Sequence, residues 1–213
     1  MHIEPGLIAA PKLAFAAVAA TAVLACYVPR LVKQPLLLLH SVLAALFFSV
    51  FMQIFHMKAG PSELHFLGAM PIYLAFGFVP TLIGFALGLL LQGLVFEPQD
   101  LQNLAVNSLT LILPLMALHY TLGRKLVAQG VSRVQQIVKL DAVYYAGVVA
   151  MVGFWLTLGE TATALGEWAT FALAYAPWLL VEPLVTLAML WLIDKARKTS
   201  WGALCFQAPA QAQ

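Results

Sequence analysis

Long apolar runs constrain this chain more than any motif does. A helix needs about 20 apolar residues, at about 1.5 Å each, to cross roughly 30 Å of hydrocarbon. Seven segments qualify, at approximately Leu7–Val28, Pro35–His56, Glu63–Phe78, Thr81–Phe96, Asn103–Thr121, Leu140–Gly159 and Trp168–Ile193. Hydrophobic residues make up 62% of the chain and charged residues 9%, against about 25% charged residues in soluble domains. The sequence therefore predicts an all-α fold, a polytopic membrane bundle of about seven transmembrane helices.

The composition also bounds the domain organisation. A net charge of +2 is too small to indicate a nucleic-acid-binding protein. Residues 1–198 are expected to form a single transmembrane domain, and residues 199–213 a short cytoplasmic tail that is disordered. The sequence has no G-x-x-x-x-G-K-[ST] phosphate loop. Any ATP hydrolysis linked to this chain is therefore expected on other polypeptides.

The apolar stretch over residues 63–96 needs a break, because one helix of that length would overshoot the bilayer by about 20 Å. The break is predicted at Gly77-Phe78-Val79-Pro80. A proline inside a helix loses a backbone hydrogen bond and clashes with the preceding turn. The third and fourth spans are therefore expected to be joined by a very short connection.

The basic residues predict the orientation of the bundle. With the N-terminus outside, nine of the eleven Lys and Arg residues fall on the cytoplasmic side, as the positive-inside rule favours. These nine are Arg30, Lys33, Arg124, Lys125, Arg133, Lys139, Lys195, Arg197 and Lys198. Only Lys12 and Lys58 remain outside. The predicted topology is N-terminus outside and C-terminus cytoplasmic.

Polar side chains in or near a membrane are costly and indicate function. The candidates are His2, His40, His56, His65, Asn107, His119 and Glu182. Paired histidines on facing helices can hold a b-type haem, with His40 and His119 toward the cytoplasm or His56 and His65 toward the outside. The alternative for His40 and His119 is an interfacial imidazole whose polar tip contacts water. Glu182 is interpreted as a buried, hydrogen-bonded anchor for helix packing.

His2 stands directly after the amino terminus. The start of the chain lacks the basic region and the cleavage site of a secretory signal, so the mature chain is expected to begin at Met1. The free amine, the His2 backbone nitrogen and the His2 imidazole can then chelate one metal ion in fused rings. A fourth nitrogen would complete the square plane that favours Ni(II) or Cu(II). The alternative is that a histidine at this position is chance.

The segment over residues 58–65 lies on the same predicted side as the amino terminus. Gly60 and Pro61 predict a turn, and Ser62 is predicted to cap a helix with His65 in its first turn. The His65 imidazole would then lie at the mouth of that helix, within reach of a metal carried by the amino terminus. A helix-start histidine that faces water is the alternative.

These features, taken in order, resemble the CbiM or NikM family, the membrane substrate-capture subunits of energy-coupling-factor cobalt and nickel importers. The resemblance runs from about Met1 to Lys195. It rests on Met1-His2-Ile3, His65-Phe66-Leu67-Gly68-Ala69, Leu91-Gln92-Gly93-Leu94-Val95-Phe96, Asn107 and Glu182-Pro183-Leu184-Val185-Thr186. The order Glu4-Pro5 and a loop before His65 that is one residue longer than usual mark a divergent subgroup.

The resemblance implies a function and a ligand set. Co(II) or Ni(II) would be held by the Met1 amine, the His2 amide and imidazole, and the His65 imidazole, with Ser62 and Asn107 as neighbours of the ligands. The chain would bind the transported ion without a prosthetic group or an enzyme activity of its own. Its implied partners are a transmembrane coupling subunit, two ATPase subunits and, optionally, a small accessory membrane protein, in a prokaryotic cell membrane.

Two other interpretations remain open at this stage. A related subunit could carry another small cargo, such as a vitamin, in an apolar and aromatic pocket. A b-type haem subunit would use the paired histidines. An intramembrane enzyme is disfavoured, because no serine–histidine pair, paired carboxylates or H-E-x-x-H motif occurs.

Overall fold

The computed structural model describes residues 2–3, 6–59, 62–131, 133–157 and 165–207. The long helices are α1 (Ala10–Lys33), α2 (Pro35–Ile54), α4 (Phe78–Val95), α5 (Leu104–Leu118), α7 (Val134–Thr157) and α9 (Trp178–Ala196). The short helices are α3 (Ala69–Phe76), α6 (Arg124–Ala128), α8 (Leu165–Ala174) and α10 (Ser200–Cys205). The 3-10 helix η1 (Pro98–Asn103) precedes α5, and the π-helical turn η2 (His119–Gly123) joins α5 to α6.

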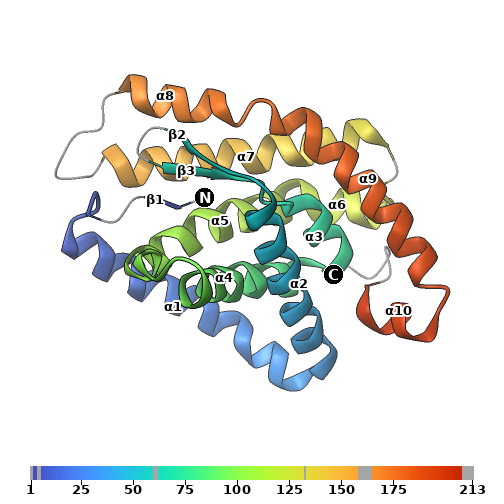
Figure 1. The fold of residues 1–213 in the computed structure, drawn as a ribbon. Helices are drawn as coiled ribbons and strands as arrows, with labels where there is room; N and C mark the ends of the chain where they lie inside the picture. The colour runs from blue at the N-terminus through green and yellow to red at the C-terminus, as the bar shows by residue number, and fades with distance from the viewer. Residues whose placement is uncertain (1, 4–5, 60–61, 132, 158–164, 208–213) are drawn as a thin grey trace.

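Six helical stretches in the described part of the chain are long and apolar enough to cross a membrane. They comprise α1, α2, α4, the continuous stretch from η1 to α6, α7, and the end of α8 with α9. The chain is therefore a multi-pass membrane protein, and the predicted polytopic helical bundle is confirmed. Figure 1 shows the helices packed as one bundle, with three short strands at one end and α10 at the other.

Two glycines bring α2 and α4 into close contact. A Cβ atom on Gly84 would lie 2.6 Å from the Ala44 side chain, and one on Gly88 would lie 2.5 Å from Phe48. Such approaches are possible only without a side chain, and small residues commonly let membrane helices pack in this way. The Gly84–Gly88 pair therefore serves packing within this chain.

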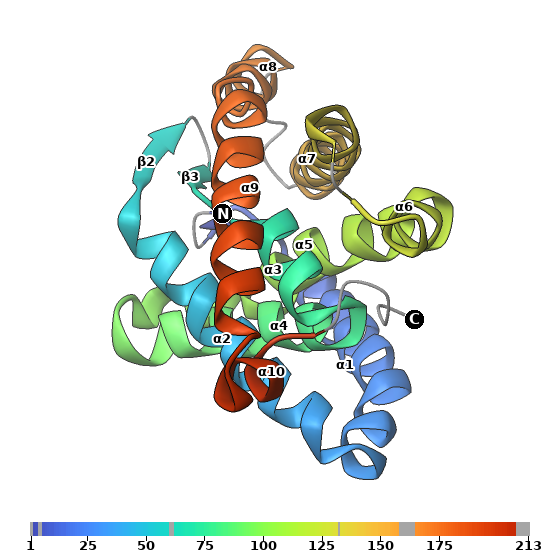
Figure 2. The same cartoon turned by 90° about the vertical axis from the view of Figure 1, so that its right-hand side faces the viewer.

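The third predicted span is not a full helix. Only Ala69–Phe76 is helical there, and eight residues rise about 12 Å, less than half of the hydrocarbon core. Almost every residue of α3 is buried, and α3 packs against α2, α4, α7 and α9 (Figure 2). The predicted break is confirmed at Gly77, which has φ +84°, while Pro80 lies inside the first turn of α4, where its missing N–H costs nothing.

The residues that precede α3 form a small antiparallel sheet. Its strands are β1 (His2–Ile3), β2 (His56–Ala59) and β3 (Ser62–His65), with β3 in the centre. The prediction that Ser62 caps a helix and that His65 lies in its first turn is therefore wrong. Both neighbouring strands decide the outcome, because β1 and β2 pair with β3 and satisfy backbone groups that a helix would otherwise satisfy internally.

The C-terminal tail is ordered at its start, so the expectation of a disordered tail from residue 199 is wrong for α10. Thr199 caps this helix through a bond from the Gly202 N–H to its hydroxyl at 3.1 Å. Beyond α10, the Gln207 N–H donates to the Ala75 carbonyl at 2.9 Å, which ties the tail to α3. Residues 208–213 lie outside the described part of the chain.

Candidate metal-capture site

The amino-terminal strand is held by two asparagines from the segment that enters α5. The Ile3 N–H donates to Asn107 Oδ1 at 3.1 Å, and Asn103 Nδ2 donates to the Ile3 carbonyl at 2.8 Å. Both asparagines are 1% exposed, and Ile3 is fully buried. The expectation that Asn107 steadies the amino-terminal segment thus has direct geometric support. Asn103 makes the second contact, which the sequence did not indicate.

The pairing of β1 with β3 determines where the amino terminus points. The Cα partners are His2 with Glu63 and Ile3 with Ser62, in antiparallel register. The amino-terminal end of β1 is therefore directed toward the His65 end of β3. For His2 and Ser62 the structure describes only the backbone, and Met1 lies outside the described residues.

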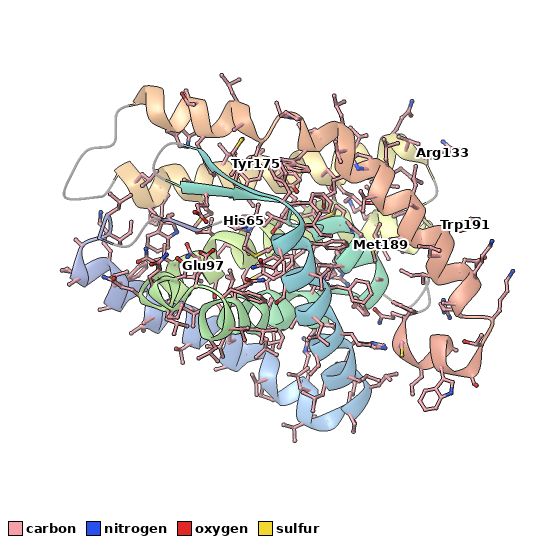
Figure 3. All side chains as sticks on the ribbon, viewed as in Figure 1. His65, Glu97, Arg133, Tyr175, Met189 and Trp191 are labelled. Carbon is pink, nitrogen blue, oxygen red and sulfur yellow. The ribbon has the colours of Figure 1, made fainter. Side chains whose placement is uncertain are left out.

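The His65 imidazole is buried, with each ring nitrogen facing an oxygen. His65 Nδ1 lies 3.2 Å from the Met52 carbonyl, and Nε2 lies 3.3 Å from Glu63 Oε2. A carbonyl can only accept, so Nδ1 carries a hydrogen, and in the neutral ring Nε2 then presents its lone pair. A cation at this position would be attracted both by the Nε2 lone pair and by the Glu63 carboxylate. Figure 3 shows His65 in the interior of the bundle. The Tyr175 side chain interacts with the His65 backbone.

Glu63 is a residue of this site that sequence reasoning missed. Its side chain lies on the same face of β3 as His65, because alternate residues of a strand share a face. The sequence does contain a signal for it, because Glu63 and His65 are two residues apart, the spacing that places side chains on one face of a strand. It is hidden when the segment is interpreted as a helix, since residues two apart on a helix point in different directions.

The remaining described histidines of the bundle serve packing. His40 Nε2 contacts the Leu204 carbonyl of α10 at 3.0 Å. His119 Nδ1 contacts the Tyr73 hydroxyl at 2.8 Å, and its ring stacks on Phe78 with centroids 3.9 Å apart and planes 1° apart. Both histidines are 3% exposed, so their interpretation as interfacial imidazoles that contact water is wrong. They are buried because the tail covers one and α3 and α4 cover the other.

Glu182 is the hydrogen-bonded anchor that the sequence suggested. Its side chain is fully buried and accepts the Met70 N–H at 3.0 Å and the Tyr145 hydroxyl. It thus joins α9 to α7 and to the first turn of α3. Among the described residues no group of three or more His, Cys, Asp or Glu side chains is arranged to hold a metal.

The sequence comparison decides the family. A family model described as CbiM, cobalt uptake substrate-specific transmembrane region, matches residues 2–200. The chain belongs to the CbiM family. It is therefore a membrane transporter component of a family of cobalt uptake, in keeping with the motifs described above. No curated protein matches the sequence.

The CbiM fold is also found among solved structures. A crystal structure titled as a transition metal transporter superposes with a TM-score of 0.72 and covers 94% of this chain and 96% of its own. The two sequences are 18% identical, so the comparison establishes a shared fold.

Proposed function

We propose that this CbiM-family chain is the metal-capture subunit of an ATP-driven energy-coupling-factor importer for Co(II) or Ni(II). The observation that carries the proposal is the register of β1 on β3, which brings His2 opposite Glu63 and directs the amino terminus toward His65. The ligands would be the Met1 amine, the His2 backbone and imidazole nitrogens, and His65 Nε2. Four nitrogens in a plane suit Ni(II) well and are compatible with Co(II).

The surroundings of His65 support its role as a ligand. Metal-bound histidines commonly donate their other ring N–H to a carbonyl or a carboxylate, which holds the ring in place. The Met52 carbonyl, 3.2 Å from His65 Nδ1, is such a partner. The Glu63 carboxylate beside Nε2 would balance part of the charge of the ion. Asn107 and Ser62 would act through the sheet, by holding β1 and β3 together.

The orientation follows from charge. The sheet lies at one end of the bundle, whereas the basic residues at the C-terminal end of α1, in α6 and at the end of α9 lie at the other (Figure 1). By the positive-inside rule the sheet would face outward and capture ions there. A transmembrane coupling subunit and two ATPase subunits, with or without a small accessory protein, would drive release inward, since the sequence has no phosphate loop.

An insertion at the amino terminus tests the capture site. A single alanine before Met1 leaves every side chain unchanged and moves the amine out of the fused-ring chelate. After loading with Co(II) or Ni(II) and desalting, elemental analysis of the unmodified protein should give about one ion per chain. The extended protein should retain little. The matched control is a protein with a cleavable extension, in which cleavage regenerates Met1 as the first residue and should restore binding.

The other outcomes are equally informative. Equal retention by the unmodified and extended proteins would refute the amino-terminal chelate. Absence of metal from both would favour another small cargo, and a Soret band on purification would favour haem. If metal is retained as expected, reconstitution with the coupling and ATPase subunits should give metal uptake into vesicles only with ATP. Uptake without ATP would refute the energy-coupling mechanism.

A further inference from the structure

Two acidic side chains lie inside the helical bundle, Asp141 on α7 and Glu182 on α9. Both are fully buried. The helices pack against each other, and the two carboxyl groups lie close enough to interact electrostatically. Neither forms an ion pair with a Lys, Arg or His side chain in the described part of the chain. Two uncompensated negative charges in a membrane interior are prohibitively costly, so this pair requires a bound positive charge.

The hydrogen bonds of the two carboxyl groups differ. Glu182 Oε1 accepts the Met70 N–H at the start of α3, and Oε2 accepts the Tyr145 hydroxyl. Two donors favour the ionised form of a carboxyl group. Neither oxygen of Asp141 has a hydrogen-bond partner among the described residues. The arrangement therefore favours a negative charge on Glu182 and none on Asp141.

A second buried polar group near this pair is Tyr144. Its side chain is fully buried, its hydroxyl has no partner within the described ranges, and it interacts electrostatically with Glu182. Asp141, Tyr144 and Tyr145 occupy positions i, i+3 and i+4 of α7, which lie on one face of a helix. This face therefore presents three buried oxygen-bearing side chains toward Glu182, and none of the three carries a positive charge.

The neighbouring elements add no positive charge. The turn before α9 supplies Tyr175, which also interacts with Glu182. On α3 the titratable group is Tyr73, which bonds His119 at the other end of that helix. Residues 104–118 of α5, which packs on α7, contain no titratable side chain. Among the described residues, every other titratable group that interacts with the pair is thus a phenol.

We propose that Asp141 and Glu182 together bind one proton, with Asp141 as the neutral acid and Glu182 as the carboxylate that caps α3. A proton on Asp141 removes the second negative charge from the buried pair and gives one Asp141 oxygen a hydrogen to donate. A metal ion would need several oxygen ligands, whereas both Glu182 oxygens already accept hydrogen bonds. Glu182 holds the first turn of α3 through the Met70 N–H, and only Phe66–Gly68 separate α3 from β3. The shared proton therefore sets the charge on the side chain that anchors the helix following the strand of His65. The proposal stands independently of metal capture.

Infrared spectroscopy of the metal-free protein in lipid nanodiscs tests the assignment. At neutral pH the spectrum should contain a protonated-carboxyl C=O band that shifts in D₂O. This band should be lost in Asp141→Asn and kept in Glu182→Gln. Asp194→Asn, which alters an exposed carboxylate at the end of α9, is the matched control and should keep it. Absence of the band from the unmodified protein, or its loss in Glu182→Gln alone, would overturn the assignment.

Thermal unfolding adds a readout that does not depend on the band. Because the folded chain would hold one proton more than the unfolded chain, its stability should fall as the pH rises. Asp141→Asn mimics the neutral acid, so it should fold and should show a flatter dependence on pH. An equal slope in the two proteins would contradict the proposal. So would a second metal ion per chain in loaded protein that Asp141→Asn removes, since the occupant would then be a metal.

Discussion

His65 and His119 are equally buried, at 3% exposure, yet the first has oxygen atoms around its ring and the second has aromatic side chains. His65 ends a strand, and its two ring nitrogens face a carbonyl and a carboxylate. His119 lies in a π-helical turn, where it bonds a phenol and stacks on Phe78. Burial alone therefore does not distinguish a proposed metal ligand from a packing residue. The atoms that the ring nitrogens face do distinguish them, because a cation is attracted to a nitrogen lone pair beside a carboxylate and not to a ring packed on aromatic side chains.

Removal of the His65 imidazole should have the largest effect. His65→Ala deletes a proposed ligand, so metal retention after desalting should fall by more than the roughly 10- to 100-fold that loss of an outer partner costs. Elemental analysis and isothermal titration measure the loss. A His65→Ala protein that binds Co(II) or Ni(II) normally would remove the distinction between the two histidines.

Asn107 should matter next, through the position of β1. Asn107→Ala removes the acceptor for the Ile3 N–H and should weaken metal binding by about 10- to 100-fold. Asn107→Asp keeps an acceptor oxygen and serves as the matched variant, with affinity close to that of the unmodified protein. Equal weakening in both variants would show that the Ile3 contact does not position the chelate.

Acidification should release the metal by competition at the ligands. The amine, the amide and the imidazole must all be free of the binding proton, so protons and metal exclude each other. Each proton displaced on binding should raise the Kd about tenfold for every unit by which the pH falls. Titrations at several pH values measure the slope. A Kd that is unchanged between mildly acidic and mildly basic pH would exclude a chelate that loses protons.

Substitution of His119 should have the smallest effect on metal. His119→Ala removes a buried, stacked ring and should lower the free energy of unfolding by about 2–4 kcal/mol. Metal retention by the folded fraction should stay at the level of the unmodified protein. The unfolding temperature in detergent, measured beside metal content, separates the two effects. Loss of metal from a His119→Ala protein with an unchanged unfolding temperature would show that the region around His119 also takes part in metal binding.

Much of the architecture was predictable because membrane crossing depends on length and composition alone. The break at Gly77 followed from the proline three residues later and from the thickness of the bilayer. His65 and Asn107 were identifiable as polar residues in an apolar chain. Asn103 was not, because its role depends on strand β1, which pairs across about 60 residues with β3 and contacts a helix about 100 residues away. Glu63 was missed because its segment was interpreted as a helix, where it would not share a face with His65.

The sequence by itself determined that the chain spans a membrane, roughly where its helices run, and to which family it belongs, because hydrophobicity and ordered motifs are local properties. Only the tertiary structure decided that the residues before α3 form a sheet, that α10 covers His40, and that α7 and α9 pack together with Asp141 and Glu182 both buried. Each of these outcomes depends on partners distant in the chain. Backbone groups and carboxylates take the state that their spatial neighbours can satisfy, and those neighbours exist only once the bundle has assembled.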